Sequence, residues 1–228
     1  MDDHTQGRQN SKNENAPAAK TAFKKRKKIT LSYLTNAGLY YLQRFPASKA
    51  QFRKVMMRKI DRSCKDHPDQ DKDTLIPLLD EQVIPKFIDL GLINDALYSK
   101  GLASSLRRRG ASTNGIVQKL RHKGLEPDDI HIALSDIDER IEESGQHADI
   151  DLDSLGGANF VAALTLARKK RIGPFSKTPP PDDQAEAAHH RDKQMAKLAR
   201  QGFSYDIVQR VITMNQDDAE TLLAQLIL

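Results

Sequence analysis

The chain has 228 residues, no Trp, 5% aromatic residues and a formal net charge of +5. So few aromatic residues argue against one large aromatic core, and the single cysteine, Cys64, excludes an intramolecular disulfide framework and fits a reducing compartment. The sequence contains neither a run of about 18 apolar residues nor an apolar N-terminal signal core, so we expect a cytoplasmic protein without a membrane span.

The first 28 residues form a polar tail that ends in a block of five cations, Lys24 to Lys28. We expect residues 1–28 to be disordered. A dense block of cations beside a folded module is typical of a nucleic-acid contact, because each phosphate that it neutralises releases condensed counterions. The alternative interpretation is a solvated tail without a partner.

Residues 29–92 are predicted to form a first helical unit. Ser48 is a candidate N-cap for one of its helices. A polar insertion near residues 64–74 leads to an apolar helix, in which Pro77 suits the first turn and Pro85 predicts a kink.

Residues 93–145 are predicted to form a second unit of three helices. Asn94 is a candidate cap of the first, which ends at Gly110, and Ser112 is a candidate cap of the second, which ends at Gly124. The third begins with a proline and two acidic residues, which suit a helix N-terminus. The apolar positions expected on their inner faces are Leu97, Leu102, Leu106, Ile116, Val117, Leu120, Ile130, Ala133, Leu134, Ile137 and Ile141.

Residues 146–228 are predicted to form a third unit on the same plan. Its first helix should span about 159–170 and its second 193–200, and Ser204 should cap the third, before a last short helix. Between the first two helices lies an insertion near residues 177–192, whose three consecutive prolines predict an extended excursion.

The segment Lys119–Leu125 recurs in altered form as Lys197–Phe203, 78 residues later, and the apolar register continues beyond the shared glycine. Ser48 aligns with Ser112 at an offset of 64 residues. Constant offsets are typical of repeat proteins, and short helices with one apolar stripe must pack together to stay folded. The sequence therefore predicts an all-α, elongated and curved array of three tandem three-helix repeats.

Four segments resemble the RecX family: Leu106–Ser112, Leu120–Leu125, Ala162–Pro174 and Leu198–Val208. The resemblance covers about residues 31–228, and the chain departs from the family in its basic tail and its two insertions. It implies a modulator of the recombinase RecA that consists of three tandem three-helix repeats. Such a protein lies in the helical groove of the RecA–single-stranded DNA filament and inhibits the ATPase, strand-exchange and co-protease activities of RecA.

On this interpretation the partners are the RecA nucleoprotein filament and single-stranded DNA, with weaker binding to duplex DNA. We expect a non-enzymatic monomer in the cytoplasm, associated with the nucleoid when bound to filaments, without a cofactor or membrane contact. The alternative is a DNA-binding regulator that uses a helix-turn-helix-like unit independently of RecA. Against it, no single helix concentrates the Arg, Asn and Gln residues that read base edges.

Cationic triplets end the first helix of units two and three. One or two cations would stabilise a helix C-terminus, by about 0.3–1 kcal/mol each, and three in a row exceed that need. Stacked repeats would present these clusters along one side of the array. The candidate filament- and DNA-binding residues are Lys24, Lys25, Arg26, Lys27, Lys28, Arg44, Arg107, Arg108, Arg109, Arg121, Lys123, Arg168, Lys169, Lys170 and Arg171.

Two apparent ligand motifs fail on their chemistry. The stretch 110–115 has the glycine spacing of a phosphate loop, but the Lys and the Ser or Thr that would follow are absent. The stretch that starts at Asp149 begins like a calcium loop, but Phe160 stands where the bidentate Glu belongs. We therefore predict no catalytic residue and no metal site.

Overall fold

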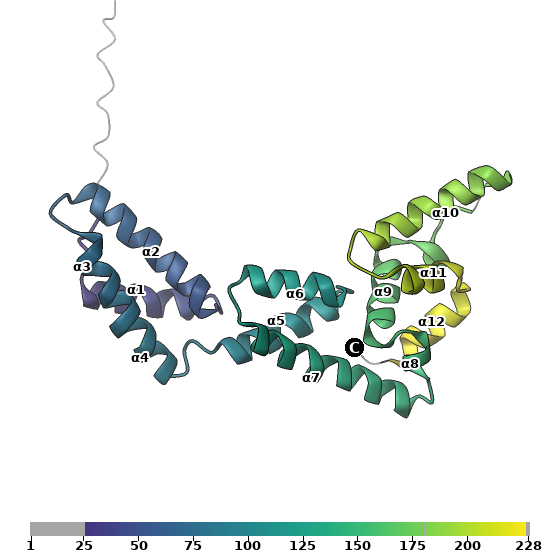
Figure 1. The fold of residues 1–228 in the computed structure, drawn as a ribbon, viewed down its shortest axis with the longest axis horizontal. Helices are drawn as coiled ribbons and strands as arrows, with labels where there is room; N and C mark the ends of the chain where they lie inside the picture. Colours follow the sequence, from purple (N-terminus) through teal and green to yellow (C-terminus); the bar gives the residue numbers. More distant parts are fainter. Residues whose placement is uncertain (1–25, 180, 227–228) are drawn as a thin grey trace, which may run out of the picture.

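The computed structural model describes residues 26–179 and 181–226, and all regular secondary structure in these ranges is helical. The helices follow one another in an elongated, bent row, from residues 31–89 at one end through 95–147 to 152–225 at the other (Figure 1). No helix in the described ranges has both the length and the apolar character needed to cross a bilayer. The prediction of an all-α, elongated fold is confirmed.

Unit one contains α1 (Leu31–Leu42), α2 (Lys49–Asp66), α3 (Lys72–Pro77), the π-helical segment η1 (Leu78–Val83) and α4 (Ile84–Asp89). Thr30 and Ser48 cap α1 and α2, because their side-chain oxygens accept backbone N–H groups of the first turn. Phe52 and Phe87, whose ring centroids are 5.6 Å apart, join α2 to α4 in the core. The helix α2 continues through part of the predicted insertion, so the loop that follows it covers only residues 67–71.

The apolar helix of unit one differs from its prediction at its start and in its interior. It begins at Lys72 rather than at Pro77, because the side chain of Asp71 caps its first turn. Pro85 has no amide hydrogen, so a regular α-helical ladder through it would leave a carbonyl group unpaired. The π-helical turn of η1 directly precedes this proline and shifts the hydrogen-bond register there.

Unit two contains α5 (Asp95–Arg107), α6 (Thr113–His122) and α7 (Pro127–His147). Asn94 and Ser112 cap α5 and α6 as predicted. Gly124 follows α6 in the left-handed region, with φ of +72°. One expected core position is wrong: Leu97 is 69% exposed, because it lines an open hollow opposite Pro46 and Ala47 of unit one instead of packing into a core.

Unit three contains α8 (Leu152–Leu155), α9 (Gly157–Lys170), the 3₁₀ turn η2 (Gly173–Phe175), α10 (Gln184–Ala199), α11 (Tyr205–Thr213) and α12 (Gln216–Gln225). The predicted excursion over 177–192 is too long. Asp183 accepts the N–H of Glu186 at 2.9 Å and caps α10 nine residues before the predicted start. The whole stretch from Phe160 to Ala167 is buried, because α7, α8, α11 and α12 surround α9.

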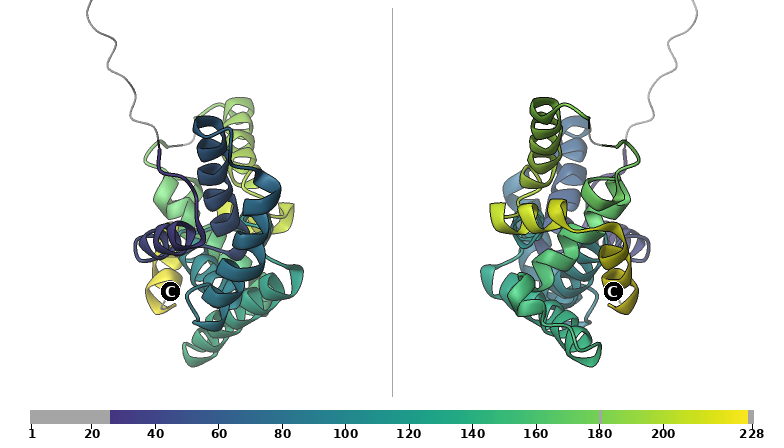
Figure 2. Two further views of the ribbon diagram at one scale, coloured as in Figure 1. Left: turned by 90° about the vertical axis from the view of Figure 1, so that its left-hand side faces the viewer. Right: turned by 90° about the vertical axis from the view of Figure 1, so that its right-hand side faces the viewer.

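The second helices of the three units, α2, α6 and α10, follow one another along one side of the row, and α7 lies along the opposite side (Figures 1 and 2). Ser48, the N-cap of α2, donates its hydroxyl to the carbonyl of Lys123 at the end of α6 (2.5 Å). Ser112, the N-cap of α6, donates in the same way to the carbonyl of Gln201 at the end of α10 (2.6 Å). The two joints between units are therefore built on one plan.

The two joints differ in their packing. Ala158 and Val161 of α9 belong to the same buried core as Ile137 and Ile141 of α7, whereas the core of unit one is separate from both others. At the first joint a hollow of about 410 Å³ remains, lined mostly by apolar residues such as Leu97. The predicted boundaries after residues 28, 92 and 145 stay a proposal, and the second joint is a packed contact rather than a linker.

Candidate functional site

The basic block at the end of the tail lies partly against unit one. Residues 24–25 lie outside the described residues. Arg26 Nη1 is 2.9 Å from Asp66 Oδ2, and Lys28 forms an ion pair with Asp69. The backbone N–H of Arg26, with its guanidinium, lowers the pKa of Asp66, and the Lys28 ammonium group lowers that of Asp69. Two of the five cations thus already have acidic partners, at exposed positions where ion pairs contribute little.

Side chains in and next to the predicted polar insertion form hydrogen bonds with residues 27 and 29. The side-chain amide of Gln70 pairs with both backbone groups of Ile29, at 3.0 and 2.7 Å, and Ser63 donates to the carbonyl of Lys27 at 3.3 Å. Residues 26–28 are therefore ordered, and the expectation of disorder up to residue 28 is wrong for these three.

Arg107 is the clearest correction among the candidate binding residues. Its side chain is 1% exposed, and its Nη2 lies 2.7 and 3.0 Å from the two carboxylate oxygens of Asp138. The guanidinium also donates to Asn159 of α9 (3.1 Å), Thr113 (2.9 Å) and the carbonyl of Ala111 (3.1 Å). A side chain enclosed in this way fastens α5 to α7 and α9 and does not reach a partner molecule.

The remaining cations of both triplets are exposed. Arg108 and Arg109 project from the end of α5, where Arg109 Nε donates to the carbonyl of Ser105 (3.0 Å). The residues from Arg168 to Arg171 are all exposed at the end of α9. The structure therefore leaves two cations of the first triplet on the surface, and all three of the second together with the preceding Arg168.

Arg171 adopts a left-handed conformation, with φ of 55°. It matches Gly110, because the N–H groups that follow, of Ile172 and Ala111, bond back to Ala167 and Leu106 in the same way. Replacing Arg171 with glycine should relieve backbone strain and raise the free energy of unfolding by about 1 kcal/mol, as thermal or chemical denaturation would show. A lower stability would contradict this reading of the backbone.

The single candidate cations lie at the ends of two helices, α1 and α6. Arg44, just after α1, is exposed and stacks over the Tyr40 ring at 4.8 Å. Arg121 is exposed and Lys123 is half-buried at the end of α6. The last two therefore lie on the side of the row that carries α2 and α10.

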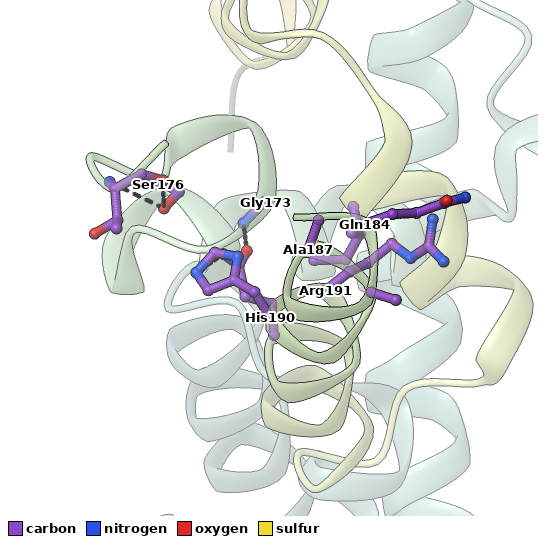
Figure 3. Close-up of a pocket in the computed structure, with 10 residues that line it drawn as sticks. Gly173, Ser176, Gln184, Ala187, His190 and Arg191 are labelled. Atoms are coloured by element: carbon purple, nitrogen blue, oxygen red, sulfur yellow. Dashed lines mark hydrogen bonds between the residues drawn. The ribbon is translucent and has the colours of Figure 1, made fainter. Parts of the chain in front are cut away.

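The hollow in unit three, about 440 Å³ in volume, lies between α10 and the loop after η2 (Figure 3). Gln194 is buried and accepts the N–H of Gly173 at 2.5 Å, and its amide nitrogen lies 3.2 Å from His190 Nε2. These contacts hold the loop against α10, so the Gln194 amide already has partners within the protein.

Metal ligands and the single thiol are the remaining candidate groups among the described residues. No group of three His, Cys, Asp or Glu side chains among them could hold a metal ion. Cys64 is a free, half-buried thiol near the end of α2.

No family model matches the chain. A protein of Myxococcus xanthus named "Regulatory protein RecX" is 34% identical over 213 residues, which cover 93% of this chain and 98% of that protein. The chain belongs to the RecX family.

Further RecX relatives agree with this assignment. A protein of Agrobacterium fabrum with the same name is 28% identical over 195 residues, covering 85% of this chain and 89% of the relative. The crystal structure of RecX from Lactobacillus salivarius covers 85% of this chain and 96% of its own, with a TM-score of 0.50 at 21% identity, and therefore shows a shared fold.

In this RecX-family chain, basic and acidic residues are concentrated on different helices. The prediction from the sequence centred on the cationic triplets and did not identify this feature. Helix α2 contains seven Lys or Arg and two Asp, whereas α7 contains seven Asp or Glu and one Arg. These two helices lie on opposite sides of the row, so the basic helix and the acidic helix do not share a side (Figure 1). The regular spacing of Lys54, Arg58 and Arg62 was the sequence signal that could have identified the basic helix.

Proposed function

We propose that this chain regulates the recombinase RecA by binding the RecA–single-stranded DNA filament along its helical groove, without chemistry of its own. In that position it inhibits the ATPase, strand-exchange and co-protease activities of RecA, as a monomer in the cytoplasm. The segregation of basic and acidic charge along an elongated row supports this proposal, because a nucleoprotein filament offers a long polyanionic track.

The proposed mechanism is occupancy of the groove. Each unit adds a weak contact, and the covalent connection of the units makes the later contacts intramolecular. A chain seated in this way hinders entry of a second DNA molecule and the subunit rearrangements that accompany ATP turnover. ATP is then bound and hydrolysed by RecA, and this chain supplies charge and shape.

The test is RecA ATP hydrolysis on single-stranded DNA with increasing amounts of the full-length protein. We expect a dose-dependent fall in the rate of hydrolysis. Unchanged hydrolysis at every dose would contradict the proposal, and sequence-specific binding to duplex DNA without RecA would favour the helix-turn-helix alternative.

A triple variant tests the exposed clusters within this assay. Arg108→Ala, Lys169→Ala and Lys170→Ala together should shift the inhibition curve to higher protein concentration while the helical content by circular dichroism stays unchanged. The matched control removes three exposed cations elsewhere, at Lys86, Arg140 and Lys177. Equal shifts in the two variants would refute a specific role of the clusters.

A further inference from the structure

A cationic hollow of about 280 Å³ is lined by residues of α2 and of the end of α6. These two helices are neighbours in the row (Figure 1). The lining of the hollow contains five Lys, Arg or His residues and, among the described residues, no acid. The lining residues are Ala50, Gln51, Lys54, Val55, Arg58, Arg121, His122, Lys123 and Gly124. We call this place the α2–α6 seam.

The charges of the seam are not compensated by the described part of the chain. Lys54, Arg58, Arg121 and Lys123 form none of the ion pairs found there, although Arg53, next to Lys54, pairs with Asp80 at 2.7 Å. Arg121 and Lys123 end a helix and are accounted for by its dipole. Lys54 and Arg58 lie within α2, far from its end, so this explanation does not extend to them.

The second joint provides an internal control, because the same serine-to-carbonyl contact closes both joints. The repeat offsets place Gln118 and His122 where the seam has Lys54 and Arg58. They likewise place Ala199, Arg200 and Gln201 where the seam has Arg121, His122 and Lys123. The second joint therefore holds one Lys or Arg where the first holds four, and the same serine-to-carbonyl contact forms at both. The cations of the seam are therefore not needed for this contact between units.

We propose that the α2–α6 seam is a binding site for the phosphodiester backbone of single-stranded DNA. The proposal deepens the proposed function, since it assigns the DNA of the filament to one joint of the array. Lys54, Arg58 and Arg62 recur every four residues, about 6 Å apart along α2, and so form a line of charge that leads into the seam. A line of regularly spaced cations suits a polymer of regularly spaced anions better than it suits an isolated carboxylate.

The floor of the seam supports the same assignment. Besides the cations, the lining contains the apolar side chains of Ala50 and Val55 and the uncharged amide of Gln51. Sugar groups can lie on such a floor while the phosphates contact the Lys and Arg side chains. The site reads the backbone and not the bases, so binding should be independent of DNA sequence.

The experiment measures binding of full-length protein to a labelled oligo(dT) by fluorescence anisotropy over a range of salt concentrations, without RecA. The test variant carries Lys54→Gln, Arg58→Gln, Arg121→Gln and Lys123→Gln. The control carries Lys86→Gln, Arg140→Gln, Lys177→Gln and Lys193→Gln, four exposed cations outside the seam. Each contact between a cation and a phosphate of single-stranded DNA adds about 0.7 to the steepness of log affinity against log salt concentration. Removing four cations should therefore reduce this steepness by about 2.8. The control should keep the wild-type slope.

A smaller variant and a second assay keep the outcomes distinct. Lys54→Gln with Arg58→Gln alone should lower the slope by about 1.4 with the thermal unfolding curve unchanged. Equal slopes in test and control variants would overturn the proposal. So would a test variant that loses inhibition of RecA but keeps its DNA slope, because the seam would then contact protein. Failure of the wild-type chain to inhibit RecA would instead sink the proposed function and leave the DNA measurement standing.

Discussion

Replacing Arg107 with alanine is expected to lower the free energy of unfolding by about 3 kcal/mol. Its guanidinium lies within hydrogen-bond distance of Asp138 on α7 and Asn159 on α9, so it fastens three helices of two units. Without it the carboxylate of Asp138 loses its cationic partner inside the protein. Broken buried pairs cost about 3–5 kcal/mol, and the lower value applies because the Asp138 side chain is still 27% exposed to water.

Chemical denaturation at neutral pH measures this loss, and Arg108→Ala is the matched control. The control removes the same side chain from the next, exposed position and should change stability by less than about 0.5 kcal/mol. Equal losses in the two variants would contradict the structural role and return Arg107 to the candidate binding residues.

The deficit of Arg107→Ala should shrink in acid. Burial raises the pKa of Asp138, and the charge of Arg107 and its hydrogen bonds lower it only in part. A carboxyl group whose pKa is higher in the folded than in the unfolded state costs stability when ionised, and this cost disappears as the pH falls through the raised pKa. Removing Arg107 enlarges the cost at neutral pH only. Wild type and variant should therefore differ less at about pH 4 than at neutral pH.

The helix starts and stops that sequence predicted correctly depend on local contacts. Asn94 and Ser112 each accept an N–H group three residues ahead, so the residues that decide the cap lie within a single turn. Gly124 ends α6 for a reason that is equally local, its left-handed backbone. Such signals need no knowledge of the tertiary structure.

The fate of Arg107 could not be predicted because its partners are remote in sequence. Asp138 and Asn159 are 31 and 52 residues away, and the neighbouring Arg108 offers the same chemistry at an exposed position. The sequence showed a cationic triplet, and only the packing of α5 against α7 and α9 separates its buried member from its exposed ones. Whether a residue at a joint is buried depends on which helices of the next unit pack against it.

The α2–α6 seam could not be predicted from the sequence for the same reason. The spacing of Lys54 and Arg58 marks one edge of a helix, which by itself is typical of any solvated helix. Their meeting with Arg121 and Lys123 depends on the end-to-end contact of α2 with α6, which spans 75 residues of sequence between Ser48 and Lys123. A surface assembled from two units is visible only once the units are docked.

Adding a single methyl group at the joint between units two and three is also expected to lower stability strongly. Gly110 has φ of +79°, and a Cβ atom there would lie 2.7 Å from the backbone nitrogen of Leu166 and 2.8 Å from the carbonyl oxygen of Ala162. Both atoms belong to the backbone of α9, so a small rotation of a side chain cannot relieve the clash. Left-handed strain of about 1–2 kcal/mol and overpacking of about 1–3 kcal/mol add up to an expected loss of about 2–5 kcal/mol for Gly110→Ala.

Gly101→Ala is the matched control for this change, because it adds the same methyl group to α5 at a position where a Cβ meets no atom within 4 Å. There the substitution should raise the free energy of unfolding by about 0.5–1 kcal/mol, since alanine restricts the unfolded chain and favours the helix. Chemical denaturation of the two variants should thus give shifts of opposite sign. A Gly110→Ala protein as stable as wild type would mean that α5 does not approach α9 this closely.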